Sequence, residues 1–147
     1  MKKITVLLLA LSLSAFAHDE GHGPKLKDVG RKGGRVTSVV LSKDASKGAS
    51  ADLVYKCEIV RSKDGKVKIY FYDKDMNPLK LDSFAKIAKA TLISGKSGKE
   101  TEKVFDLAFA RDHFEGMTPK PIPRRYNIDV RVGEGDKELL AAFDNLD

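Results

Sequence analysis

The sequence predicts an all-β protein, an antiparallel immunoglobulin-like sandwich of about seven strands, with a small β-barrel as the alternative. Three observations predict this class. Apolar and polar residues alternate with the period of a half-buried strand in one short segment after another. Turn-forming residues separate these segments at intervals of about ten residues. No segment has an apolar period long enough for a helix of domain length.

The first half of the domain is predicted to contain three strands. Residues 36–41 form the first strand, and a loop of small residues follows. Residues 51–61 and 67–73 alternate on either side of an Asp64-Gly65 turn, which is a strong hairpin signal. Segment 79–88 fits either a single helical turn capped by Ser83 or an extended conformation.

The second half is predicted to contain four more strands, at residues 90–94, 103–110, 126–132 and 139–143. Residues 111–124 are polar and rich in proline, so we interpret them as a crossing between strands. Cys57 is the only cysteine and therefore has no disulfide partner within the chain. It shares the apolar face of its strand with Leu53, Tyr55 and Ile59, which predicts an inert thiol in the core.

Residues 1–17 have the pattern of a cleavable signal peptide. Lys2 and Lys3 precede an apolar stretch that is too short to span a membrane, and Ala15-Phe16-Ala17 supplies the small-x-small cleavage site. We therefore expect a periplasmic or secreted protein that begins at His18 and has no membrane span after cleavage. Residues 18–34 are expected to form a flexible tail containing histidine and glycine, and residues 35–147 the β-sandwich.

Composition narrows the classes of function. The mature 130 residues suffice for one domain, and their charge falls from +6 to +4 when Lys2 and Lys3 are removed. The basic clusters have no interleaved aromatic residues of the kind that stack on nucleic-acid bases, so we expect no nucleic-acid partner. No nucleophile elbow, phosphate loop or HExxH motif is present, and we expect no enzyme.

Two of the three histidines fall at the expected mature N-terminus and suggest a metal site. The α-amine and imidazole of His18 could chelate one ion, and His22 adds a second imidazole. Asp19 and Glu20 add carboxylates, and His113 could supply a further ligand if the tail folds back onto the domain. Nitrogen ligands of this kind favour Cu(II), followed by Zn(II). The alternative is a polar tail that keeps the cleavage site accessible.

The segment Gly30-Arg31-Lys32-Gly33-Gly34-Arg35-Val36 resembles the glycine-rich opening of small periplasmic domains associated with adaptor proteins of heavy-metal efflux pumps. The tyrosine-rich strand that ends at Pro78 (VKIYFYDKDMNP) is also similar to this family, although Met76 stands where the family has glycine. The resemblance implies a standalone β-sandwich that binds or passes on a metal ion. Its partner would be an efflux or envelope protein.

Two functions are therefore predicted from the sequence. The first is a periplasmic protein that binds Cu(II) or Zn(II) through His18, Asp19, Glu20, His22 and His113, as an accessory to metal handling or efflux. The second is a non-catalytic interaction module without a metal. Such a module would dock its partner through the strand edges or through the basic, proline-containing residues 119–125.

Overall fold

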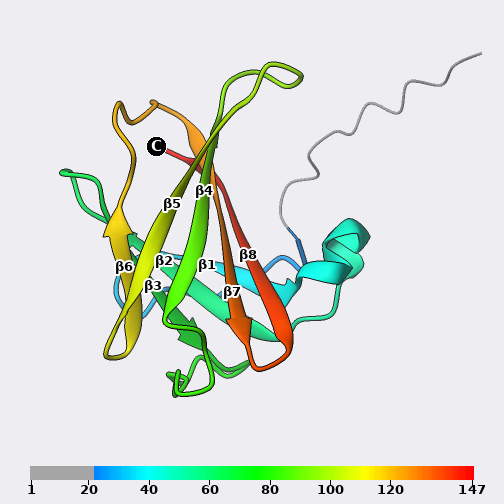
Figure 1. Ribbon diagram of the computed structural model, residues 1–147. Coiled ribbons are helices and arrows are strands. Elements are labelled where there is room, and N and C mark those ends of the chain that lie inside the picture. The colour runs from blue at the N-terminus through cyan, green and yellow to red at the C-terminus, as the bar shows by residue number, and fades with distance from the viewer. Residues whose placement is uncertain (1–21) are drawn as a thin grey trace, which may run out of the picture.

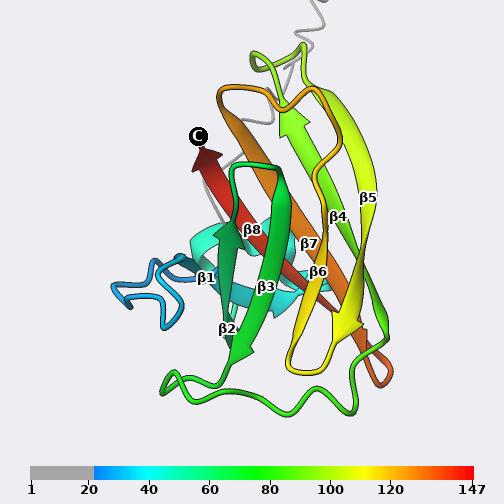
Figure 2. The same ribbon diagram turned by 90° about the vertical axis from the view of Figure 1, so that its left-hand side faces the viewer.

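Eight antiparallel strands curl into a closed barrel in the computed structural model, which describes residues 22–147 (Figures 1 and 2). Around the barrel the strands follow the order β1-β2-β3-β6-β5-β4-β7-β8, and β8 returns to β1. The elements are β1 (Arg35–Leu41), η1 (Ser42–Ser50), β2 (Tyr55–Arg61), β3 (Lys66–Tyr72), β4 (Ile87–Ser94), β5 (Thr101–Ala110), β6 (His113–Met117), β7 (Tyr126–Glu134) and β8 (Lys137–Leu146).

The prediction of an immunoglobulin-like sandwich is wrong, because the strands form the alternative fold, a barrel. Two sets of pairings close it. β1 pairs with both β2 and β8, and β6 joins β3 to β5. Alternation along a strand reports which side chains face a core, and that pattern is the same on the inner face of a sandwich and inside a barrel. The fold class therefore depends on strand partners, which the alternation does not specify.

Apolar side chains fill the interior of the barrel. Phe71, Phe84 and Phe114 meet in edge-on and tilted contacts with ring centroids 5.2–6.5 Å apart. Cys57 is fully buried among these core residues, which confirms its predicted position. The other buried members of this cluster include Ile59, Val67, Ile69, Leu92, Leu107, Ile128, Val130, Leu139, Phe143 and Leu146.

Part of the outer surface of the barrel is also covered. η1 packs Ala45 against a small second cluster formed by Val40, Ala51 and Leu140. Residues 139–143 of β8 are all buried, with Leu140 on the outer face covered by η1, which explains why this stretch is apolar without strict alternation. Within residues 22–147, no helix has the length and apolar character needed to cross a bilayer.

The predicted hairpin between β2 and β3 is confirmed. Gly65 adopts a φ of +95°, and the Ser62 amide donates to the Lys66 carbonyl at 2.9 Å. Strand β6 was not predicted, because it lies in the segment interpreted as a polar crossing. The actual crossing to β7 covers residues 118–125 and runs over one end of the barrel (Figure 1). This end, which also holds the β2–β3 and β4–β5 turns, is called the crossing end below.

Candidate functional site

The predicted metal ligands divide into two groups. His18, Asp19 and Glu20 lie outside the residues that the structure describes. His22 lies beside η1, where its Nδ1 forms a 2.8 Å hydrogen bond with the carbonyl of Ala45. His113 lies on β6, three strands away from β1 around the barrel. The structure therefore does not bring His22 and His113 to one site.

His113 is held on the outer surface by its own neighbours. Its Nδ1 lies 2.8 Å from Asp112 and its Nε2 lies 3.3 Å from Glu115, while its ring stacks on Tyr70 at 5.0 Å. These hydrogen bonds lower the pKa of both carboxyl groups. The two carboxylates contact opposite edges of the ring, so the three groups cannot converge on one ion. Among residues 22–147, no group of three or more His, Cys, Asp or Glu side chains is arranged to hold a metal.

The glycine-rich segment has a structural role in this fold. It wraps the carboxylate of Glu58, which is 0% exposed although it lies on the outer face of β2. The amides of Lys32 and Gly34 donate to its Oε1 at 2.9 and 2.7 Å, and the Tyr72 hydroxyl donates to its Oε2 at 2.7 Å. Burial and this hydrogen bond raise the pKa of Tyr72, so the phenol keeps the proton that it donates. Residues 30–34 are thereby fixed to the barrel wall.

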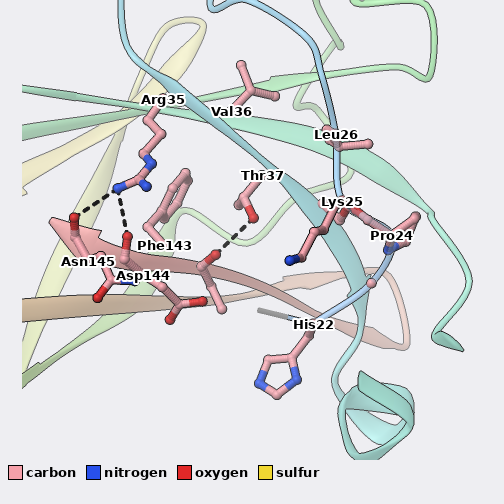
Figure 3. Close-up of a pocket in the computed structure, with 13 residues that line it drawn as sticks. His22, Pro24, Lys25, Leu26, Arg35, Val36, Thr37, Phe143, Asp144 and Asn145 are labelled. Atoms are coloured by element: carbon pink, nitrogen blue, oxygen red, sulfur yellow. Dashed lines mark hydrogen bonds between the residues drawn. The ribbon is translucent and has the colours of Figure 1, made fainter. Parts of the chain in front are cut away.

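A small pocket of about 290 Å³ lies where β1 and β8 separate (Figure 3). The pairing of these strands ends at Val39 and Ala141. Beyond that point side chains replace the backbone ladder: Thr37 donates to the Ala142 carbonyl at 2.9 Å, and Arg35 donates to the carbonyls of residues 144 and 145 at 2.7 and 3.0 Å. Residues 22–26 of the same chain line the opposite wall. His22, Arg35, Thr37 and Ser38 all form hydrogen bonds within the protein, which makes this pocket part of the barrel seam.

A larger pocket, of about 820 Å³, lies at the crossing end. Its walls come from the start of β1, the β2–β3 turn, the crossing and the start of β7. Four basic side chains line it, Arg35, Arg61, Lys63 and Arg124, against one acidic residue, Asp147. Its apolar lining is Ile59, Val60, Ile122, Pro123 and Tyr126. A pocket of this size with a few charged groups and apolar walls has the character of a binding site.

The cations of this pocket fall into two pairs. Arg61 is anchored: it donates to the Tyr126 hydroxyl and to the main-chain oxygen of Asp147, both at 2.9 Å, and lies over the Tyr126 ring. Arg35 is anchored in the same way by the carbonyls at the end of β8. Lys63 and Arg124 are exposed on the rim. The anchored guanidinium groups give the pocket a fixed positive charge, and the rim cations are free to follow a ligand.

The charge of the whole barrel is unevenly divided between its ends. The connections and strand ends at the crossing end contain eleven basic and four acidic residues, and those at the opposite end contain seven basic and nine acidic residues. The first set is 31–35, 61–66, 95–100, 118–125 and 144–147, and the second is 42–54, 73–86, 111–112 and 134–138. The pocket therefore lies at the positive end of the molecule.

The sequence identified only one wall of this pocket. The basic crossing, residues 119–125, was predicted as a docking segment, and it contributes Ile122, Pro123 and Arg124. Arg35, Arg61 and Lys63 were not predicted, because Arg35 is distant in sequence from the other two and all three have ordinary surface character. The hairpin register was the sequence feature that could have identified two of these residues, because it places Arg61 beside the turn that contains Lys63. Finding Arg35 also requires the pairing of β1 with β2.

Comparisons of the chain with protein-family models, with curated proteins and with solved structures find no match.

Proposed function

We propose that this protein is an exported, non-catalytic interaction module that binds an acidic segment of a partner protein at the crossing end of its barrel. The proposal rests on one observation, the presence of four basic residues and only one acidic residue among those that line the pocket of about 820 Å³. Export is proposed from the signal-like residues 1–17.

The chemistry of the pocket favours a carboxylate-bearing ligand. A guanidinium group offers a planar fork of donors that matches a carboxylate, and Arg61 and Arg35 are already oriented by contacts with main-chain oxygens. Ile122, which is 36% exposed, and the half-buried Pro123 supply apolar surface next to these charges. A segment that combines acidic and apolar side chains would therefore satisfy both parts of the site.

The uneven charge of the barrel supports a macromolecular partner. A positive end and a slightly negative opposite end create a field that orients an acidic surface before contact. The basic residues extend beyond the pocket rim to residues 96, 99, 120 and 125, over a wider area than a small ligand would cover. This arrangement fits a partner whose acidic segment enters the pocket while its remaining surface faces the surrounding cations.

A charge-reversal experiment tests the proposal. The probe is a capped, fluorescein-labelled peptide of alternating glutamate and glycine, which is acidic but has low strand propensity. We expect binding by fluorescence anisotropy that weakens with salt, and a loss of about tenfold or more in the variant Lys63→Glu/Arg124→Glu, because like charges would then face the peptide. These two side chains are exposed and hold no strand in place, so the fold should be retained.

A matched control separates the site from net charge. Lys74→Glu/Lys80→Glu makes the same change in charge at the opposite end, on two exposed lysines, and should bind the probe as the unmodified protein does. Equal weakening by both double variants would show that only net charge matters and would overturn the proposal. An absence of binding to the unmodified protein at millimolar probe would overturn it as well.

A further inference from the structure

β5 has a stretch of unpaired backbone on one side. Its register with β4 is continuous from Thr101 to Ala108, whereas its pairing with β6 covers only Ala108 to Ala110. β6 ends at Met117, and the chain then leaves the sheet for the crossing. The first half of β5 therefore continues beyond its neighbour and forms a strand edge at the crossing end (Figure 1).

The ladder geometry identifies the free backbone groups. The amide of Phe109 donates to the carbonyl of Lys86 at 2.8 Å, in line with the register of β5 and β4. Because bonding direction alternates along an antiparallel strand, the odd-numbered residues of β5 bond to β4 and the even-numbered ones face the other side. The amides and carbonyls of Glu102 and Val104 consequently point to the open edge.

The crossing does not cover this edge. The amide of Thr118, its first residue, donates to the Gly65 carbonyl at 2.9 Å, which ties it to the β2–β3 turn instead of β5. In Figure 2 the chain after β6 arches over towards β7. Val104 is 64% exposed, and Glu102 and Lys103 are exposed beside it. An added strand would thus find both hydrogen-bonding groups and an apolar side chain.

A second copy of the chain fits this edge poorly. For antiparallel self-pairing, the outward-bonding residues Glu102 and Val104 must face their counterparts. One such register places Lys103 opposite Lys103, and another places Glu102 opposite Glu102. A third pairs Val104 with itself but sets Glu102 against Asp106. Like charges directly opposite each other destabilise a strand pair, so each register is penalised.

We propose that the open edge of β5 binds an extended segment of another protein, with acidic and basic residues interspersed, as an added antiparallel strand. The side chains of β5 alternate between its two faces, and they determine which residues the added strand needs at each position. An acidic residue would lie opposite Lys103, basic residues would lie opposite Glu102 and Asp106, and an apolar residue would lie opposite Val104. Backbone hydrogen bonds to Glu102 and Val104 would supply affinity for any extended segment. The side chains of β5 would determine which segment binds best.

The experiment is an amide chemical-shift titration with the capped peptide Lys-Thr-Val-Glu-Lys-Thr, which sets valine opposite Val104, glutamate opposite Lys103 and lysines opposite Glu102 and Asp106. We expect perturbations centred on the amides of Glu102 and Val104. Val104→Pro removes the outward amide without touching the β4 ladder and should abolish binding, whereas Val104→Ala keeps the amide and should bind within about threefold of the unmodified protein. Lys103→Glu retains the whole ladder and should weaken binding by about fivefold or more.

The two proposals fail separately. If the peptide binds only at the pocket, the perturbations will move to Lys63 and Arg124, and Lys63→Glu/Arg124→Glu will abolish them, which overturns strand addition and leaves the proposed function intact. If Val104→Pro unfolds the protein, Lys103→Glu still decides the question. Unchanged binding by Lys103→Glu, or no shift at Glu102 and Val104 at millimolar peptide, would overturn the inference.

Discussion

Glu58 shows how a single buried carboxylate organises the start of the folded domain. An unpaired buried charge costs several kcal/mol, and here that cost is offset by three donors, two backbone amides and the Tyr72 hydroxyl. The amides come from Lys32 and Gly34, so residues 30–34 must approach the barrel closely. A Cβ at Gly30 would lie 2.2 Å from Oε1 of Glu58 and 2.5 Å from the Gly34 carbonyl. Glycine is therefore required at position 30, because there is no room for a side chain.

The first prediction concerns Gly30. Gly30→Ala should lower the free energy of unfolding by about 1–3 kcal/mol, because either the carboxylate or the glycine-rich segment must move. Urea unfolding followed by circular dichroism measures this change. Gly133→Ala is the matched control: its Cβ would meet atoms no closer than 3.7 Å, and stability should stay within about 0.5 kcal/mol. Equal effects of the two variants would contradict this account of Glu58.

The second prediction concerns Cu(II) at the expected mature N-terminus. If processing exposes the α-amine of His18, one extra residue ahead of it should weaken Cu(II) binding strongly, because the amine and ring no longer belong to one residue. His22→Ala should weaken binding less. Isothermal titration with copper, on protein whose N-terminus is verified by mass, measures both effects. Unchanged Cu(II) affinity after the extension would show that the α-amine and the imidazole of His18 do not chelate the ion together.

His113 serves as the internal control for that titration. Both of its ring nitrogens already contact carboxylates, and it lies three strands from β1. His113→Ala should therefore leave Cu(II) affinity unchanged. A clear loss would show that the tail reaches β6 and would restore His113 to the metal site.

β6 is the element on which closure of the barrel depends. It has five residues and pairs with β3 on one side and β5 on the other. Its second residue, Phe114, is 0% exposed and its ring contacts those of Phe71, Phe84 and Phe109. The strand thus joins two parts of the sheet and also fills the interior.

The third prediction is that Phe114→Ala lowers the free energy of unfolding by about 3–5 kcal/mol, the cost of a cavity left by a buried aromatic ring. Val104→Ala on the exposed face of β5 is the control and should cost no more than about 0.5 kcal/mol. Urea denaturation measures both. A loss below about 1 kcal/mol for Phe114→Ala would mean that β6 is dispensable to the closed barrel.

The strands that could be predicted are those with several inward apolar residues. β2, β3 and β7 each alternate over seven residues or more, and the Asp64-Gly65 pair marks the turn between the first two. β6 offers one large inward residue, Phe114, and prolines follow it closely. Its position is fixed by tertiary pairing with β3 and β5, which is why local alternation missed it and why the sandwich prediction failed.

At the scale of the whole molecule, the uneven charge could not be predicted from the order of residues. Basic and acidic residues alternate along the chain in mixed pairs, and the sequence alone suggests an evenly charged surface. The antiparallel strands bring residues 31–35, 61–66 and 118–125 to the same end of the barrel, where the positive charges of their basic side chains combine. The candidate site is thus a product of topology, and only its crossing segment was predictable.

Closure also decides how the only cysteine behaves. β2 is paired on both sides, by β1 and β3, so no free edge lies next to Cys57. The thiol is 0% exposed, and burial, with a further contribution from the charge of Glu58, raises its pKa well above the usual value. Since the thiolate is the reactive form, native Cys57 should be inert for two reasons, inaccessibility and protonation.

The fourth prediction follows from this closure. A thiol reagent should label Cys57 in the native protein only through opening of the barrel, so the labelling rate should follow the population of the open state. Phe114→Ala, which lowers stability by about 3 kcal/mol or more, should speed labelling by about two orders of magnitude, and Val104→Ala should leave it unchanged. Mass spectrometry of quenched samples measures the rates. Fast labelling of the unmodified protein would contradict a sealed core. A rate that does not respond to Phe114→Ala would place the opening locally at β2, because only a local motion could expose Cys57 without releasing β6 from β3 and β5.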